Sequence, residues 1–167
     1  MNQEEISDLI RRAEEDDIDS QNELAARFAT GDGIEKNQEL AIHWYKKAAA
    51  QESFEAKYNL AMMYFFGEGV EKNIEKAKIL LNDAACNGSS DACLVLGEAF
   101  ELGNINCTID YLIAARYYIE AIRLGSTKGI RCIGDLLIEN KVDQKQLGIL
   151  MKKYQLGDLP TLARRAD

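Results

Sequence analysis

The stretch LAARFATGDGIEKNQELAIHWYKKAAA, residues 24–50, decides the fold, because its pattern returns 36 residues later as LAMMYFFGEGVEKNIEKAKILLNDAAC, residues 60–86. Within it, GDGIEKN at 31–37 becomes GEGVEKN at 67–73. A third copy starts at Leu96 and Gly97 and needs one extra residue after Gly103. A period of roughly 20–50 residues is typical of solenoids, whose units bury their apolar sides by stacking on their neighbours.

Each unit is predicted to hold two helices joined by a glycine-bearing turn. In the second unit, residues 53–66 and 74–86 place apolar side chains on one face at helical spacing. Gly67 and Gly69 supply the backbone freedom for the turn, and Asn87-Gly88 ends the second helix. The core positions of the two helices are Ala56, Leu60, Ala61 and Tyr64, followed by Ala77, Leu81, Ala84 and Ala85.

One repeat position holds only small residues, and we expect it to mark a close helix contact. Its members are Ala25, Ala61, Gly97 and Gly134. A larger side chain at this position would hold two helix backbones apart.

The pattern predicts an all-α, right-handed α/α superhelical solenoid of about four helix-pair repeats, with about eight helices and partial units at both ends. We expect one domain over residues 1–167. Its expected parts are a capping helix (3–15), three repeats (17–51, 52–88 and 89–125), a partial repeat (126–157) and a tail (158–167).

Composition narrows the class of partner. Hydrophobic residues make up 47% of the 167 residues, and the formal net charge is -8. An acidic chain disfavours nucleic acids and anionic membranes, because both are bound largely through Lys and Arg. No apolar run approaches the roughly 20 residues that span a bilayer, and the N-terminal stretch does not resemble a signal peptide. We therefore expect a cytoplasmic protein with a neutral or basic protein partner.

The sequence has only weak candidates for motifs of catalysis, phosphate binding or metal binding. The GxG pairs lack the strand and lysine context of a phosphate loop, and His43 is the only histidine. The four cysteines form no CxxC pair, so we expect buried, reduced thiols, no metal and no cofactor. The acidic cluster Glu14–Asp17 with Asp19 is expected to be a solvated helix end.

The repeats resemble the SEL-one-like repeat family, a relative of the tetratricopeptide (TPR) family. Residues 24–50, with the Trp44-Tyr45 pair, and residues 60–88 carry the resemblance, which covers about 5–140. The third unit departs, with NINCTIDY after Gly103, and its loop is expected to have its own shape. The resemblance implies adaptors and scaffolds without a shared reaction or ligand. Some secreted members carry a disulfide in each repeat, but Cys86 is one residue late for such a bond with Cys93.

In the resembling TPR architecture, the first helix of each pair lines the concave side. Counting from the central leucine places Asn22, Ala26, Ala29 and Thr30 there in the first repeat, where small residues would leave space. The candidate partner-binding residues are Tyr58, Met62, Phe65, Phe66, Leu94, Glu98, Glu101, Arg131 and Asp135. Exposed aromatic and methionine side chains are typical interface anchors, and acidic rim residues favour a basic partner. Alternatively, Phe65 and Phe66 cover the adjacent turn or pack against a neighbouring unit.

Two classes of function follow. The first is a non-enzymatic module that binds a protein partner in its concave groove. Its sharper version is an immunity protein that neutralises a cognate toxin, and its alternative is an adaptor or scaffold. The remote second class is a carboxylate-based enzyme that uses Glu98 with Asp135, which would be neighbours in the groove.

Overall fold

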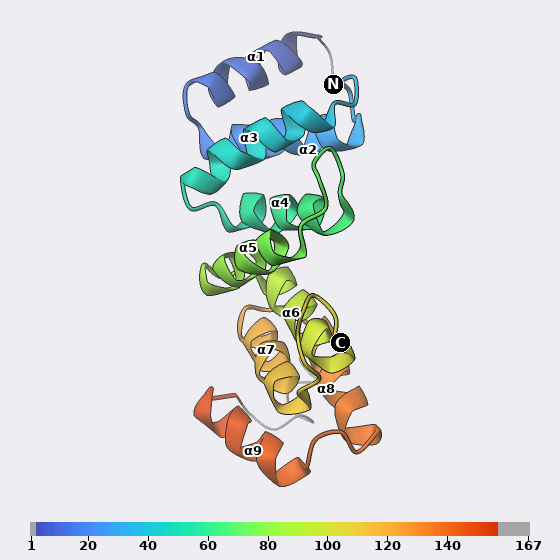
Figure 1. Cartoon of the computed structure of the whole chain (residues 1–167). Coiled ribbons are helices and arrows are strands. Elements are labelled where there is room, and N and C mark those ends of the chain that lie inside the picture. The colour runs from blue at the N-terminus through green and yellow to red at the C-terminus, as the bar shows by residue number, and fades with distance from the viewer. Residues whose placement is uncertain (1–2, 157–167) are drawn as a thin grey trace. The chain divides into compact units, whose positions relative to one another are not determined.

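The computed structural model describes residues 3–156, and within that range the chain forms nine helices and no strand, against about eight expected (Figure 1). The helices are α1 (Gln3–Glu14), α2 (Ile18–Thr30), α3 (Gln38–Ala50), α4 (Phe54–Phe66), α5 (Ile74–Cys86), α6 (Ser90–Leu102), α7 (Tyr111–Arg123), α8 (Lys128–Ile138) and α9 (Gln144–Lys153). The prediction of an all-α solenoid of helix-pair repeats is confirmed. The predicted tail, 158–167, lies outside the described residues.

The chain divides into two compact units, residues 1–87 and 88–167, where the sequence suggested one domain. The boundary lies one residue before the predicted junction between the second and third repeats, 88/89. In a repeat protein each unit contacts only its neighbours, so a boundary can fall at any junction.

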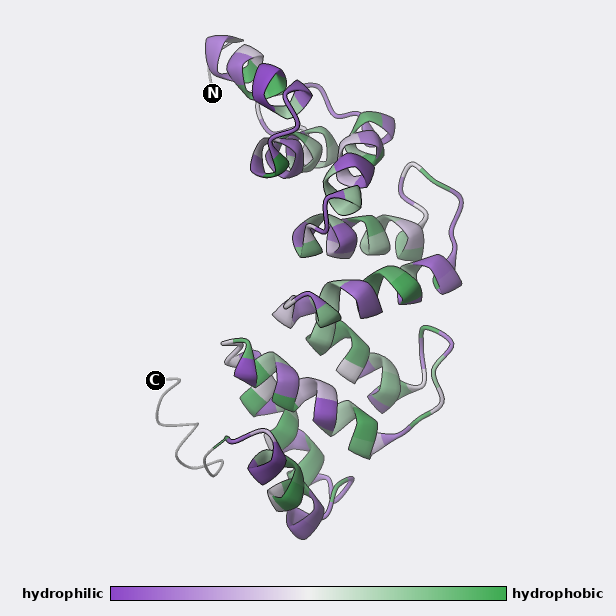
Figure 2. Cartoon of the chain, turned by 90° about the vertical axis from the view of Figure 1, so that its left-hand side faces the viewer, coloured by the Kyte–Doolittle hydropathy of each residue, from purple (hydrophilic) through white to green (hydrophobic). Residues whose placement is uncertain are grey.

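In unit 1 α2 packs on α1, α3 on α2, α4 on α3 and α5 on α4. The core includes Leu24, Tyr45 and Leu60, with the predicted Ala56 and Ala61 fully buried and Tyr64 half-buried. In unit 2 α7 packs on α6 and α8 and also contacts α9. Apolar and polar residues alternate along the helices, as expected when one helix side is buried (Figure 2).

Hydrogen-bonding side chains begin the helices at the repeat period. Asp17, Ser53 and Ser89 precede α2, α4 and α6, and each accepts a backbone N–H three residues later. Asn37, Asn73 and Asp110 do the same before α3, α5 and α7. Such capping oxygens satisfy backbone donors that have no partner within the helix. Asp17 therefore caps α2, a role more specific than the solvated helix end that we expected.

The three inter-helix turns close in the same way despite the extra residue in the third. The backbone N–H of Asn37 donates to Phe28 O at 2.8 Å, that of Asn73 to Tyr64 O at 2.8 Å, and that of Asp110 to Phe100 O at 2.9 Å.

A left-handed residue also recurs within the turns, at Gly33, Gly69 and Ile105, with φ of 73°, 69° and 50°. The third loop, which we expected to have its own shape, therefore keeps part of the repeat geometry. Its shape differs at Asn106, which also has a positive φ of 51°. A branched residue in this region is strained, and the Ile105 side chain is buried in compensation.

The small-residue position behaves as expected at Gly97 but not at Gly134. A Cβ at Gly97 would lie 2.4 Å from Cε1 of Tyr118, so α6 and α7 approach closely there. A Cβ at Gly134 would meet nothing within 4 Å. The prediction of a close contact at Gly134 is wrong, because α8 begins the closing repeat and no helix within residues 3–156 packs closely over this residue.

Candidate binding surface

Helix α4 presents the predicted aromatic residues on the side away from the core. Ser53 starts the helix, and Leu60 and Met63 point into unit 1. The α4 face, defined as Tyr58, Met62, Phe65 and Phe66, belongs neither to that core nor to the half-buried residues packed against it. Three of its members are half-buried, and Phe66 is 60% exposed.

The two phenylalanines at the end of α4 are not equivalent. Their rings meet edge to face, with centroids 4.9 Å apart. Lys72 of the following turn places its Nζ 5.6 Å from the centroid of Phe65. Phe65 thus partly covers the turn, as the alternative interpretation held, whereas Phe66 offers most of its side chain to solvent.

The first repeat adds little to this surface. Ala26 and Ala29 pack against the core of unit 1 and so do not leave the open space that we expected. Asn22 Nδ2 donates to Ser53 Oγ at 2.7 Å and so ties α2 to the start of α4. Thr30 is exposed.

The remaining five predicted residues lie in unit 2. Glu98, Arg131 and Asp135 are exposed, as a binding surface requires. Leu94 is half-buried and packs against the core of this unit, so it contributes to the packing of unit 2. The expectation that these residues and the α4 face line one groove stays a prediction.

Glu101 is not the rim charge that the sequence suggested. Its side chain is only 18% exposed, its Oε2 accepts from the Tyr118 hydroxyl at 2.7 Å, and its Oε1 accepts from Lys141 Nζ at 3.0 Å. Burial and this bond raise the pKa of the Tyr118 phenol. Lys141 also bonds Glu139 and lies over the Tyr111 ring, so Glu101 ties α6 to α7 and to the α8–α9 connection.

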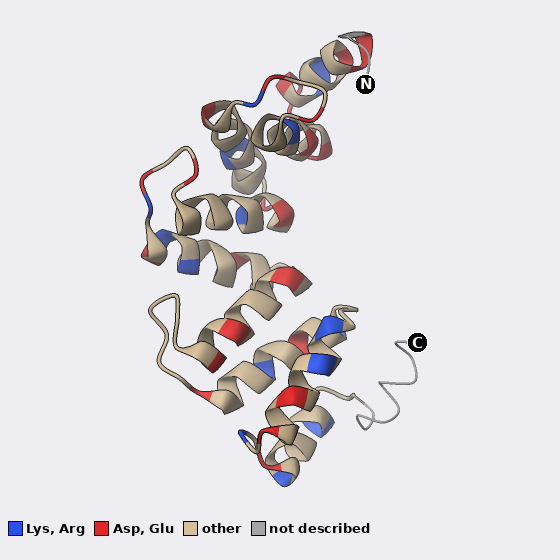
Figure 3. Cartoon of the chain, turned by 90° about the vertical axis from the view of Figure 1, so that its right-hand side faces the viewer, with Lys and Arg blue, Asp and Glu red and all other residues tan. Residues whose placement is uncertain are grey.

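The distribution of charge differs between the units. Residues 1–87 hold 18 acidic and 10 basic side chains, whereas residues 88–167 hold 10 of each. Figure 3 shows carboxylate residues (red) throughout the helices and turns of the N-terminal part. The formal net charge of -8 therefore belongs to unit 1, which also carries the α4 face. An excess of negative charge on one unit attracts positively charged partners and speeds their association.

Two polar trios in unit 1 were not foreseen. The buried Gln21 amide donates to Ala13 O at 3.0 Å and to Asp16 Oδ1 at 3.3 Å, and it accepts from Gln51 Nε2 at 2.9 Å. One repeat later, buried Lys57 bonds Glu52, which also accepts from Asn87 Nδ2 at 3.5 Å. Asp16 and Glu52 both have a positive φ, of 64° and 66°. The sequence signals each trio by a polar residue, Gln21 or Lys57, four residues before the small-residue position at Ala25 or Ala61.

Groups suited to catalysis or metal binding do not gather in the described part of the chain. No set of three or more His, Cys, Asp or Glu residues that could hold a metal lies in residues 3–156. His43 is exposed, with its ring edge on Trp44 at 5.2 Å. All four cysteines are free, and Cys93 and Cys107 are buried as expected. Cys132 is only half-buried, and Cys86 is exposed because it lies one residue past the inward-facing positions of α5. No described helix is long and apolar enough to cross a membrane.

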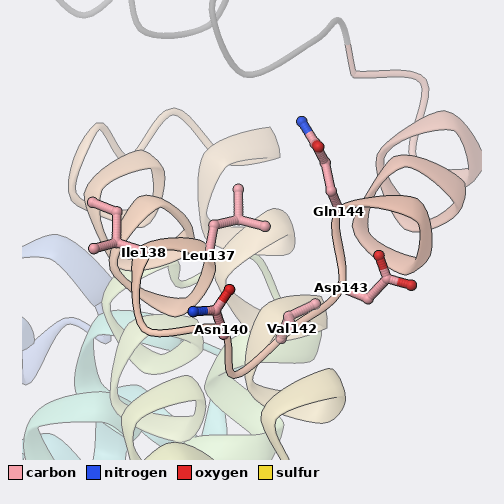
Figure 4. A pocket seen from close by; sticks show the side chains of 6 residues that line it. All are labelled: Leu137, Ile138, Asn140, Val142, Asp143 and Gln144. Atoms are coloured by element: carbon pink, nitrogen blue, oxygen red, sulfur yellow. The ribbon is translucent and has the colours of Figure 1, made fainter.

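The connection between α8 and α9 borders an open hollow of about 620 Å³ (Figure 4). Leu137 and Ile138 come from α8, Asn140 and Val142 from the connection, and Asp143 and Gln144 from the start of α9. The only carboxylate, Asp143, accepts the backbone N–H of Lys145 at 2.9 Å. It thus caps α9, and the hollow has no group free for acid–base chemistry.

Sequence comparison identifies the repeat. The profile of the family described as Sel1 repeat matches residues 18–53, 54–89 and 90–126. The chain belongs to the Sel1 repeat family. Sel1 repeats act as protein–protein interaction modules, and the family generally serves as a non-enzymatic scaffold.

Solved structures agree with this assignment. A Sel1 repeat protein from Oxalobacter formigenes is 32% identical with a TM-score of 0.69, and the match covers 78% of this chain and 98% of that protein. A protective antigen of uropathogenic Escherichia coli strains that displays an SLR fold is 28% identical with a TM-score of 0.70 over 77% of this chain and 27% of its own length.

Helicobacter pylori cysteine rich protein B is 22% identical with a TM-score of 0.59, covering 74% of this chain and 88% of that protein, and shows the shared fold alone. No curated protein matches this Sel1 repeat chain significantly.

Proposed function

We propose that this Sel1 repeat chain binds a basic protein partner through the α4 face of unit 1. The observation that carries the proposal is Phe66, a large aromatic side chain that is 60% exposed beside three half-exposed apolar neighbours. Exposed clusters of aromatic and methionine residues are typical interface anchors, and the repeat core does not need this one. The acidic charge of unit 1 selects a basic partner and speeds association.

In its sharper form, the proposal is that the partner is a toxin and that this protein neutralises it in the cytoplasm. A small acidic domain can block a basic enzyme by covering its active surface, which needs no chemistry of its own. An adaptor role is the alternative, and it requires two partners bound at the same time. Finding the protein in the cytoplasmic fraction supports the inhibitor role, and finding it outside the cell contradicts it.

Two variants of equal exposure test the surface. Phe66 and Ile79 are each 60% exposed in unit 1, but Ile79 lies on α5 and outside the α4 face. Phe66→Ser is expected to weaken the binding of a partner captured from the native host by more than about 2 kcal/mol, which is the scale of an interface anchor. Ile79→Ser is expected to leave affinity unchanged. Equal effects of the two substitutions, or none, contradict the proposed surface.

The inhibitor form has its own test. The captured partner is expressed alone and together with this chain. Growth arrest that the wild type relieves and Phe66→Ser does not relieve supports neutralisation. A partner that is harmless alone, or a ternary complex with two captured proteins, favours the adaptor.

A further inference from the structure

Unit 2 contains a second hollow, of about 350 Å³, on the side of α7 that meets α9. It is lined by Phe100 of α6, by Ile113, Arg116, Tyr117 and Glu120 of α7, and by Tyr154 at the end of α9. Sites for small ligands have volumes of roughly 300–1,000 Å³, so this hollow fits one group the size of an aromatic side chain.

Aromatic rings form the floor of the hollow. Phe100 and Tyr117 stack nearly parallel, with centroids 5.8 Å apart and planes at 14°. Phe100 and Tyr154 also pack against the core of unit 2, so the core holds these two rings in place. Ile113 completes an apolar surface suited to a flat or branched apolar group.

The charges at the rim favour an anion. Glu120 is already neutralised, because Arg123 Nε donates to both its carboxylate oxygens at 3.0 Å. Arg116 is exposed and has no ion-pair partner in the described part of the chain. The local balance is one positive charge, which disfavours a cation in spite of the aromatic rings. A guanidinium can bind a carboxylate through two parallel hydrogen bonds.

This combination occurs in one repeat only. Arg116 stands where α3 and α5 have His43 and Ile79. Tyr117 stands where α3 has Trp44, which is buried and lies beneath the Lys47 ammonium. The repeat fold therefore does not require an arginine beside an open aromatic floor.

We propose that this hollow binds an apolar group, preferably aromatic, that ends in a carboxylate. The apolar part packs on Phe100, Tyr117 and Tyr154, and Arg116 binds the carboxylate. Such a group is either a free aryl-alkanoic acid or the C-terminal residue of a polypeptide. The site lies in unit 2 and does not depend on the α4 face.

The test titrates the full chain with 3-phenylpropionate, N-acetyl-phenylalanine and N-acetyl-phenylalanine amide, with binding followed by calorimetry and amide chemical shifts. Both acids are expected to bind at least 10-fold more tightly than the amide and to shift signals of α7 and of Tyr154. A tighter N-acetyl-phenylalanine indicates a polypeptide C-terminus, a tighter phenylpropionate indicates a free acid, and equal affinities support the shared chemistry.

Matched variants separate the site from general charge. Arg116→Gln is expected to abolish the preference for acid over amide, whereas Lys128→Gln, which removes one exposed positive charge outside the hollow, is expected to preserve it. Circular dichroism checks that both variants stay folded. Equal binding of acid and amide by the wild type, no effect of Arg116→Gln, or no binding at millimolar concentrations overturns the proposal.

Discussion

Adding one methyl group at each of two glycines in the same repeat position is expected to change stability in opposite directions. Gly97 and Gly134 both lie inside helices of unit 2. Alanine is favoured over glycine in a helix interior by about 0.5–1 kcal/mol. At Gly134 a Cβ meets nothing within 4 Å, so that gain is expected in full.

At Gly97 the same methyl group would lie 2.4 and 2.6 Å from two ring carbons of Tyr118. The ring cannot move away easily, because Tyr118 is 2% exposed and its hydroxyl is bonded to Glu101. Overpacking costs about 1–3 kcal/mol, and loss of the hydroxyl's bond adds about 1 kcal/mol. After the helix gain is subtracted, Gly97→Ala should destabilise the chain by about 1–3 kcal/mol.

Urea and thermal unfolding followed by circular dichroism measure both variants. Gly134→Ala should raise Tm, and Gly97→Ala should lower it, by about 2–4 °C per kcal/mol for a chain of this size. Combining Gly97→Ala with Tyr118→Leu should cost less than the sum of the single changes, because the smaller side chain makes room. A stabilising Gly97→Ala, or equal effects of the two glycine variants, would refute the reasoning.

Three further predictions concern buried groups. Burial raises the pKa of Tyr45 to about 12 and that of Tyr118 above its usual range. The stability that these buried neutral phenols contribute should therefore be fully present below about pH 10 and be lost as the pH rises further. Phenolate absorbance at 295 nm should show these two phenols ionising at a higher pH than the other tyrosines, and ionisation of either near pH 10 in the native protein contradicts this. Ile105→Gly should cost less than the roughly 2–5 kcal/mol of an ordinary buried truncation, because it also relieves left-handed strain; a larger loss in urea argues against strain. Glu52→Gln should destabilise more than Lys57→Met, because it leaves a buried ammonium without its counter-charge. Hydrogen bonding from Lys57 lowers the pKa of Glu52, so the stability lost in Glu52→Gln should be present above about pH 4.5 and vanish as pH falls through the lowered pKa; a difference that persists in acid argues against the ion pair.

The repeat period predicted most of the fold, because each repeat position occurs several times in one chain and its residues can be compared. Leu24, Leu60 and Leu96 share a position and are all buried. The left-handed turn residue, a glycine in two repeats, keeps its conformation even as Ile105. Such agreement comes from local geometry that every unit must satisfy to stack on the next.

The binding surface was predicted less well, because it depends on contacts that break the repeat. Glu101 looked like a rim charge, but its partners Tyr118 and Lys141 lie 17 and 40 residues away. The first two repeats hold Ala29 and Phe65 at the position of Glu101, so the period could not show these bonds. Leu94 looked like an anchor, but it packs into unit 2. Phe66 was identified because its position lies outside the core pattern, and its exposure fits that reasoning.

The polar trios of unit 1 have a consequence for how such a chain can be cut and rejoined. Each trio is complete within one segment, 16–51 for Asp16, Gln21 and Gln51, and 52–87 for Glu52, Lys57 and Asn87. A duplication or deletion with breakpoints at 51/52 and 87/88 moves the buried Lys57 together with Glu52 and Asn87. A breakpoint between residues 52 and 57 separates the buried Lys57 from its carboxylate. Genetic exchange and protein engineering should therefore tolerate 36-residue cassettes in this frame and reject most others.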